Sequence, residues 1–199
     1  MKDEKGVVAA IAAGGPSSRS GPTPVGGKLV DRVLEGASRA RANDQAARLP
    51  KLTLTLDQVV TLEMIATGVL SPLQGYPGSK DYASILDNGR LADGTPWTLP
   101  PTLAPGDDAS RRVVDSVREG DALALVGPSG APVAILHLQE KYAFDKTERA
   151  QKLFGTTERR HPGVDAIFRR LGDIALAGPI DLIEKTHWGP FEKYRLEPQ

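Results

Sequence analysis

Apolar positions along this chain fall into short blocks separated by turn residues, and their spacing alternates between extended and helical patterns. A first apolar segment, Leu29–Leu34, ends near Gly36, and Leu52–Leu54 has the β-forming composition of a short strand. Thr55 and Gln58 then form a capping-box pattern, because each side chain can bond the backbone of the other. Apolar residues at helical spacing follow, and Gly68 suits the end of a helix. The pattern predicts a helix that begins after Thr55 and ends before Gly68.

The stretch from Ser71 to Leu103 is interrupted by turn residues. Two prolines and two glycines in residues 71–78 exclude a regular helix there. A short helix is predicted from Ser79, as its N-cap, to Gly89, with Tyr82, Ile85 and Leu86 facing inward. Beyond it, Asp93-Gly94 indicates a turn, and Trp97–Leu99 is predicted as a short strand, which the neighbouring prolines place at a sheet edge.

The C-terminal half predicts a β-hairpin, two helices and further strands. Residues 121–126 and 132–138 flank Gly127-Pro128-Ser129-Gly130, which is typical of a hairpin with a longer turn. A helix capped by Asp145 is expected to end at Gly155. Apolar residues at positions 164, 167, 168 and 171 share one helical face that Gly172 would close. Strand-like runs follow at 174–176 and 180–183.

These short strands and helices do not alternate regularly, so the sequence predicts a mixed α+β fold around a small barrel or curled sheet. Residues 1–27 hold six Gly, three Pro and four Ala and are interpreted as a flexible leader, because they can bury little apolar surface. Residues 28–199 are predicted to form one domain.

Composition narrows the class of protein. The 199 residues are 40% hydrophobic and 25% charged, with 25 basic and 25 acidic side chains and no Cys. The absence of Cys excludes disulfides and thiolate metal sites, and zero net charge argues against a generic polyanion binder. The sequence contains no run of about 18 apolar residues, which is the length that could span a membrane. The apolar run at 7–13 is short and follows acidic residues, so we expect a cytoplasmic protein without a signal peptide.

Candidate chemistry is sparse, and we predict no catalytic, cofactor-binding or metal-binding residue. His137, His161 and His187 lack the spacing of a helical metal pair. We interpret them as a hydrogen-bonded strand residue, a capping or loop-locking residue and a surface residue. Nucleotide-binding glycine motifs are missing. Residues 141–170 carry eight basic and four acidic side chains, including Arg159, Arg160, Arg169 and Arg170. That group is either a solvated helix face or an RNA-binding surface.

Several blocks, in collinear order from Gly26 to Pro198, resemble ATP sulfurylase (sulfate adenylyltransferase). The longest covers residues 56–76 and is similar to that family's motif L-x-x-Ala-x-Gly-x-Phe-Ser-Pro-Leu-x-Gly-Phe. Others are Gly26–Arg32, Asp81-Tyr82 with Arg90–Pro100, Phe154–Thr157 with His161–Val164, and Gly172-Asp173 with Ala177–Ile180. These blocks belong to the family's N-terminal domain, so the resemblance implies a PUA-like fold, a small curled sheet or barrel with flanking helices.

The resemblance also implies that these residues do not include the family's main binding site for sulfate and ATP. In the family, sulfate and ATP are bound mainly by the following domain, through a Gln-x-Arg-Asn-Pro-x-His-x-x-His motif that this sequence lacks. Tyr194–Pro198 resembles the family's junction motif Tyr-Arg-x-x-Pro. Two departures are Val25, where the family commonly has His, and Leu70, where it has Phe. Sulfate transfer to ATP needs cationic groups aimed at phosphate.

We therefore expect a stand-alone or truncated, non-catalytic scaffold or docking domain in sulfate activation, with no cofactor. Its expected partner is a separate ATP-sulfurylase catalytic domain or subunit, and the chain alone is predicted to be inactive. The alternative is a PUA-like RNA- or ligand-binding module.

Overall fold

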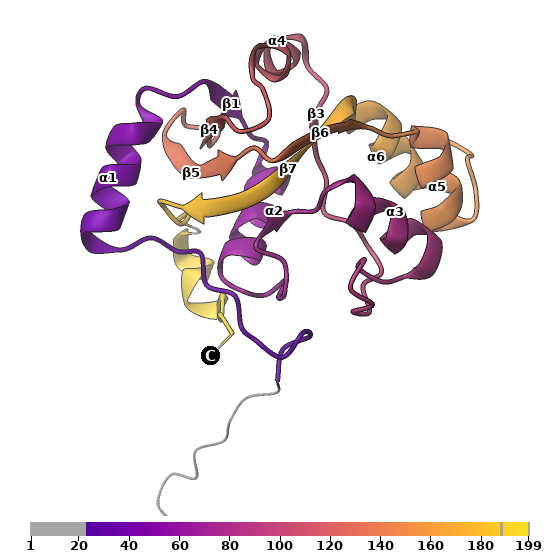
Figure 1. Cartoon of the computed structure of the whole chain (residues 1–199), viewed down its shortest axis with the longest axis horizontal. Helices are drawn as coiled ribbons and strands as arrows, with labels where there is room; N and C mark the ends of the chain where they lie inside the picture. The colour runs from indigo at the N-terminus through magenta and orange to yellow at the C-terminus, as the bar shows by residue number, and fades with distance from the viewer. Residues whose placement is uncertain (1–22, 188, 199) are drawn as a thin grey trace, which may run out of the picture.

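Strand β7 (Leu171–Leu182) organises the sheet, because four other strands pair with it. The computed structural model describes residues 23–187 and 189–198, so most of the predicted leader, residues 1–22, lies outside the described residues. The antiparallel partners of β7 are β2 (Gly75–Tyr76), β3 (Leu103–Pro105), β5 (Pro132–His137) and β6 (Glu140–Ala143). β4 (Ala122–Val126) pairs antiparallel with β5, and β1 (Lys51–Thr53) pairs parallel with β4. The strands form a curled half-barrel (Figure 1).

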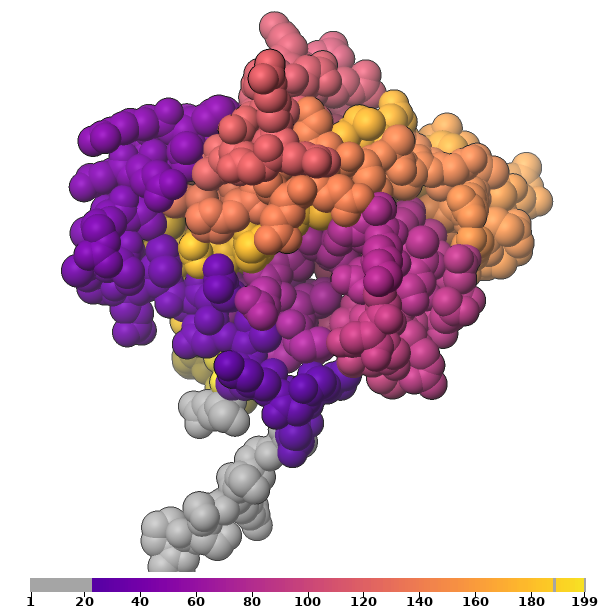
Figure 2. All heavy atoms as spheres, in the orientation of Figure 1, coloured from indigo at the N-terminus to yellow at the C-terminus, as the bar shows by residue number. Residues whose placement is uncertain are grey.

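Seven helices in the described part of the chain surround this sheet. They are α1 (Gly36–Ala46), α2 (Leu56–Ala66), α3 (Ser79–Asn88), α4 (Asp108–Ser116), α5 (Lys146–Phe154), α6 (Pro162–Arg170) and the 3₁₀ helix η1 (Gly189–Tyr194). In the space-filling view, the indigo N-terminal part with α1 and the orange part with α5 lie on opposite sides of the face shown (Figure 2). Within the described ranges, none of these helices has the length and apolarity needed to cross a membrane.

The main core lies between α2 and the sheet. Val59, Leu62 and Ile65 of α2 are at most 1% exposed, and they share one cluster with Leu123 of β4 and Ile180 of β7. Burying such side chains contributes about 1.5–3 kcal/mol each. Packing of α2 against the sheet therefore fixes the position of this helix, which also borders the sites described below.

Most predicted elements are confirmed. The structure is mixed α+β with a curled sheet, as expected. Thr55 and Gln58 form the reciprocal capping box at the start of α2. The hairpin is β4–β5, and Asp145 caps α5, which ends at Gly155. The Asp93-Gly94 turn is also present, closed by a hydrogen bond from the Gly94 amide to the Leu91 carbonyl.

Two predictions were wrong: the N-cap residue of α3 and the strand at Trp97–Leu99. The N-cap of α3 is Gly78 and not Ser79, because the carboxylate of Glu140 accepts from the Ser79 amide and takes over the capping role. Trp97–Leu99 is not a strand. It belongs to an irregular loop, and the nearby strand β3 begins only at Leu103.

The expected end of α6 at Gly172 and the two separate C-terminal strands were also wrong. α6 ends at Arg170, and β7 runs without a break from Leu171 through Gly178. Gly172 lies against β3, where a Cβ would stand 2.2 Å from the Pro105 carbonyl oxygen. Gly178 has φ +146°, and its Cβ would stand 2.0 Å from the His137 carbonyl oxygen. The two glycines thus allow close strand pairing and do not end elements.

Helix α1 was not predicted from the sequence. Only Ala42 and Ala46 of α1 are buried, packed near Ile135 and Ile183, and its N-cap residue Glu35 makes no side-chain capping bond. The preceding apolar segment is extended, and Val33 forms a bridge with Leu182.

Candidate functional site

A groove of about 1020 Å³ lies between α2, the loop 96–102, β3 and the junction of α6 with β7. Its lining is mainly apolar and also includes threonine and charged side chains. The largest apolar contributors are Met64, Leu70, Tyr76, Trp97, Leu99 and Leu171. Leu99 is 58% exposed, so its apolar side chain remains in contact with solvent at the groove. The groove is therefore an apolar surface open to a ligand.

One wall of the groove is a face of α2. Asp57, Thr61 and Met64 stand at positions i, i+4 and i+7, which bring their side chains to the same side of a helix. The opposite face of α2 carries Val59 and Leu62 into the core. The capping box and the core packing together fix the rotation of the helix, and hence the wall.

The facing wall is the loop 96–102, which a buried arginine holds in place. Arg149 of α5 is 6% exposed and donates to the Pro100 carbonyl (3.2 Å) and to Thr102 Oγ1 (3.1 Å). Trp97 adds a hydrogen bond from Nε1 to the Leu99 carbonyl (3.0 Å) and one from its amide to the Gly89 carbonyl (2.8 Å). This loop is irregular in shape but tied at several points, so the groove has a defined wall.

The charged groups around the groove are paired with one another. Arg170 Nη1 lies 2.6 Å from Asp57 Oδ2, joining α6 to α2, and Arg169 pairs with Asp165 at 2.9 Å. Asp107 caps α4, and its hydrogen bonds with Ser110 lower the pKa of that carboxyl below its usual value. Both arginines that line the groove thus have a carboxylate partner, whereas the Asp107 carboxylate is held by hydrogen bonds and has no basic partner among the described residues.

The groove floor holds a buried tyrosine whose hydroxyl has no hydrogen-bond partner among the described residues. Tyr76 is 4% exposed, and burial raises the pKa of its phenol. A buried hydroxyl without a partner costs roughly 1–3 kcal/mol. Tyr76 is therefore the one groove residue whose polar group is left unsatisfied by this part of the chain.

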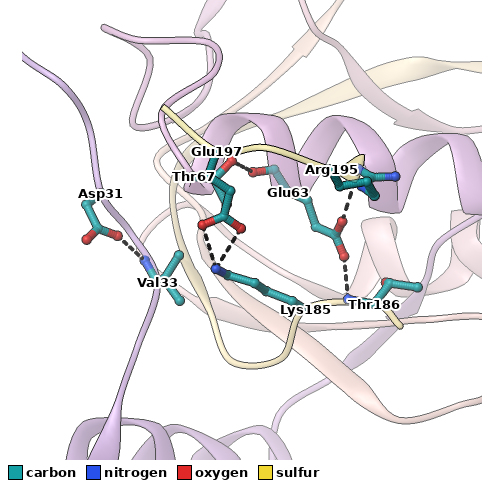
Figure 3. A network of polar contacts seen from close by, with 8 residues as sticks. All are labelled: Asp31, Val33, Glu63, Thr67, Lys185, Thr186, Arg195 and Glu197. Carbon is teal, nitrogen blue, oxygen red and sulfur yellow. Dashed lines mark hydrogen bonds and ion pairs between the residues drawn. The ribbon is translucent and has the colours of Figure 1, made fainter. Parts of the chain in front are cut away.

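A second candidate surface is the C-terminal segment, residues 185–187 and 189–197, in which Thr186 and Arg195 contact Glu63 near the C-terminal end of α2 (Figure 3). Glu63 of α2 is 6% exposed, accepts from the Thr186 amide (2.6 Å) and lies 3.6 Å from Arg195. Lys185 and Glu197 form a further ion pair at 2.7 Å. These contacts hold η1 in place.

The same segment exposes large apolar side chains. Phe191, Tyr194 and Leu196 are 69%, 70% and 88% exposed. Three large exposed apolar side chains within six positions of the chain favour a protein–protein contact surface.

The histidines have the structural roles expected of them. His137 bonds Asp181 (2.8 Å), His161 accepts from the Gly163 amide at the start of α6, and His187 is exposed. In the described ranges, no three His, Asp or Glu side chains gather into a group that could hold a metal ion.

Three of the four arginines in the predicted basic group have a carboxylate partner within the chain. It comprises Arg159, Arg160, Arg169 and Arg170 of the α5–α6 connection and α6. Arg159 and Arg169 both contact Asp165, and Arg170 contacts Asp57. The guanidinium of Arg159 also lies over the Phe168 ring at 5.2 Å. These contacts fit a solvated helix face better than an RNA-binding surface.

Of the groove residues, only Arg169 and Arg170 were singled out from the sequence, as part of the alternative RNA-binding surface. Met64 and Leu70 were interpreted as core or motif positions, and Tyr76 was interpreted as part of a turn. The available signal was Trp97 within a proline-rich stretch, where a large aromatic side chain has little core to pack into. The lining comes from segments far apart in the sequence, which no local pattern brings together.

Comparisons with known proteins agree on one family. A PUA-like domain family matches residues 22–185. The chain is 42% identical over 175 residues to a sulfate adenylyltransferase of Symbiobacterium thermophilum and 40% identical over 176 residues to one of Halothermothrix orenii. Each match covers 88% of this chain but only 43% and 45% of those proteins. The chain thus spans less than half the length of these relatives.

A solved structure described as a hexameric APS kinase from Thiobacillus denitrificans shares the fold. It superposes with a TM-score of 0.67 at 27% identity, covering 88% of this chain and 29% of that one.

Proposed function

Because this chain belongs to the PUA-like domain family and is homologous to the N-terminal region of sulfate adenylyltransferases, we propose that it serves as a non-catalytic docking domain in sulfate activation. Its partner is the catalytic part of a sulfate adenylyltransferase, on the same or a separate polypeptide. The reaction concerned joins sulfate to the α-phosphate of ATP and releases pyrophosphate.

The observation that carries the proposal is the exposed apolar surface of Phe191, Tyr194 and Leu196. These side chains stand on a segment that Glu63 of α2 ties to the domain and whose two ends the Lys185–Glu197 ion pair joins, so the surface is presented in a fixed position. Fixing a surface in advance lowers the entropy cost of binding. Aromatic residues in such a surface are the usual anchors of an interface.

The length of the relatives supports this role. Their aligned part is under half of each protein, so most of a sulfate adenylyltransferase lies outside the region that this chain matches. The domain boundary at residues 27/28 and a cytoplasmic location, where ATP is plentiful, belong to the same proposal.

A domain-exchange experiment tests the proposal. Residues 23–198 would replace the matching region of the Symbiobacterium thermophilum sulfate adenylyltransferase, and pyrophosphate release would be measured with ATP, sulfate and Mg²⁺. We expect the chimera to retain activity, and the 199-residue chain alone to release no pyrophosphate above background. Robust release by the chain alone would contradict a non-catalytic role.

A surface variant then identifies the docking residues. In the chimera, F191A/Y194A/L196A is expected to lower activity or stability, whereas L99A, which removes an exposed leucine at the groove, serves as the matched control. Equal behaviour of the two variants would refute the C-terminal segment as the docking surface. Salt-dependent binding of RNA that R159E/R169E abolishes would instead favour the RNA-binding alternative.

A further inference from the structure

The groove between α2 and the loop 96–102 is not used by the docking role, and the chain carries a segment of its own that fits it. We propose that residues 5–13, Lys-Gly-Val-Val-Ala-Ala-Ile-Ala-Ala (the N-terminal segment), bind in this groove of the same chain. The apolar run 7–13 lies against the groove lining, and Lys5 lies at the acidic end. Three observations lead to this occupant: where the described chain begins, the length of chain that precedes it, and the charges at the far end of the groove.

The part of the chain that the structure describes begins beside one end of the groove. Leu70 lines the groove, and Pro72 follows it by two positions. An added Cβ at Gly26 would stand 2.8 Å from the Cβ of Pro72. The Val30 amide donates to Ser71 Oγ at 2.9 Å, so this stretch runs along the residues that follow α2. A segment that precedes Gly26 therefore starts close to the Leu70 end of the groove.

The connection between the apolar run and the described chain is short. Residues 14–22 comprise three Gly, two Pro, three Ser and one Arg. A Gly- and Ser-rich linker of nine residues spans about 15–18 Å on average. Such a tether gives the run an effective concentration in the millimolar range at sites near Gly26. An interaction with a dissociation constant of about 1 mM therefore suffices to keep the groove occupied in about half of the molecules.

The run matches the groove in polarity and in length. It consists of two valines, Ile11 and four alanines, so it brings no charge into an apolar site. Met64 on α2 and the exposed Leu99 on the loop offer aliphatic surface from the two facing walls. From Asp57 to Met64 the wall on α2 is about 10 Å long, at 1.5 Å per residue. Seven residues cover this length in either a helical or an extended form, and burial of apolar area from both partners favours the bound state.

Asp107 lies at the end of the groove opposite to Leu70. Asp57 stands in the first turn of α2, whereas Leu70 follows the last turn, so these two residues mark the ends of the α2 wall. Arg170 pairs with Asp57, and an added Cβ at Gly106 would stand 3.4 Å from the Arg170 carbonyl oxygen. Asp107 is the next residue along the chain, which places it at the Asp57 end.

The charge of Asp107 sets the direction of the bound segment. Its exposed carboxylate lines the groove and accepts from the Ser110 amide, but no lysine or arginine among the described residues pairs with it. Lys5 precedes the apolar run by two positions. A segment that enters the groove at Leu70 and lies along α2 toward its first turn brings Lys5 to Asp107. An exposed ion pair of this kind should raise the ratio of bound to free segment about two- to threefold.

Nuclear magnetic resonance of the full chain tests the proposal. The sequence has two methionines, Met1 and Met64, and no cysteine. Isotope labelling of the methionine methyl groups thus gives one signal in the groove, and G14C accepts a single nitroxide next to the apolar run. Because a nitroxide broadens nearby methyl signals steeply with distance, we expect strong broadening of Met64 in the spin-labelled chain. V8D/I11D should lower the ratio of bound to free segment at least tenfold, since two carboxylates would have to leave water.

Matched variants locate the contact. S17D/S18D adds the same charge between the run and the domain and should leave the broadening unchanged. On the groove side, L99A should lower the ratio of bound to free segment about threefold. F191A also removes an exposed apolar side chain, but outside the groove, and should have no effect. Circular dichroism melting curves confirm that each variant is folded.

Two further substitutions test the direction of the bound segment. K5Q and D107N should each lower the ratio of bound to free segment about two- to threefold, and the double variant should lower it no further. Asn replaces Asp well as a helix N-cap, so D107N retains the cap of α4. K2Q, which removes the same charge farther from the run, should leave the broadening unchanged.

Several results would overturn the proposal. Equal broadening in the parent chain and V8D/I11D would show that the apolar run does not bring the segment to Met64. Equal effects of L99A and F191A would place the run outside the groove, and equal effects of K5Q and K2Q would refute the contact with Asp107. Broadening of Met64 in an unlabelled chain that is mixed with a spin-labelled one would show that a second copy supplies the occupant. None of these outcomes bears on the docking role, because the domain-exchange experiment uses residues 23–198, which lack the N-terminal segment.

Discussion

Replacing Glu63 by alanine should detach the C-terminal segment from α2 and measurably destabilise the protein. Glu63 is 6% exposed and accepts from the Thr186 amide at 2.6 Å, so its removal leaves a backbone donor without this acceptor. Such a loss costs roughly 1–3 kcal/mol. Arg195, whose side chain is 38% exposed, can return to water, and its contribution is at most about 1 kcal/mol.

The sum for E63A is a loss of free energy of unfolding of about 1–4 kcal/mol. For a domain of this size, each kcal/mol lowers Tm by roughly 2–4 °C, so we expect a decrease of roughly 2–16 °C. E63Q keeps an oxygen for the Thr186 amide and loses only the charge, so its loss should be near 1 kcal/mol. Urea unfolding followed by far-UV circular dichroism measures both values.

Limited trypsin digestion gives an independent readout of the same segment. Lys185, Lys193 and Arg195 lie in it, and cleavage there should be several times faster in E63A than in E63Q if the segment is released. The reasoning would be refuted if E63A unfolded within about 0.5 kcal/mol of the parent chain, or if both variants were digested at the same rate.

Three further predictions concern single positions. Y76F should leave stability unchanged or raise it by up to about 3 kcal/mol in urea unfolding, because it removes a buried hydroxyl without a partner, and a loss above 1 kcal/mol would reveal an existing partner. G178A should be poorly folded in a thermal melt, because its Cβ would stand 2.0 Å from the His137 carbonyl oxygen, whereas G94A, where a Cβ meets nothing within 4 Å, should cost only about 1 kcal/mol. D107A should cost about 1 kcal/mol at neutral pH through loss of the α4 cap. Because the pKa of Asp107 is lowered in the fold, this difference is present above the ordinary Asp pKa and should shrink as pH falls below about 4, which urea unfolding at several pH values would show.

The parts of the fold that could be predicted are those whose signals are local. The capping box of Thr55 and Gln58, the glycine at position 155 and the hairpin around Gly127 all act within a few residues, and all are found as predicted. Helix α1 was not predicted because its buried residues are Ala42 and Ala46. Two alanines do not produce a recognisable helical spacing of large apolar residues in the sequence.

Errors arose where a distant segment decides the local structure. Glu140 replaces Ser79 as the cap of α3 from a strand about sixty residues away. Trp97–Leu99 has the composition of a strand, but Arg149 holds the adjacent loop residues by hydrogen bonds and no neighbouring strand pairs with it. The groove has the same origin, since its walls meet only when α2, the loop and α6 are assembled.

Helix α2 carries both candidate surfaces, and its periodicity keeps them separate. Asp57, Thr61 and Met64 form the stripe that faces the groove, and Val59 and Leu62 face the core. Glu63 follows Val59 by one turn, so it lies beside the core stripe and about 100° from Met64.

The groove and the C-terminal segment therefore lie against two different faces of one helix, about 100° apart at Met64 and Glu63. Because the core packing and the capping box fix the rotation of α2, substitution of Glu63 should not alter binding of the N-terminal segment in the groove, and W97A should not alter docking. Coupling between the two would require that α2 rotate, which its buried side chains oppose. Measured independence of the two surfaces would thus follow from the spacing of residues along a single helix.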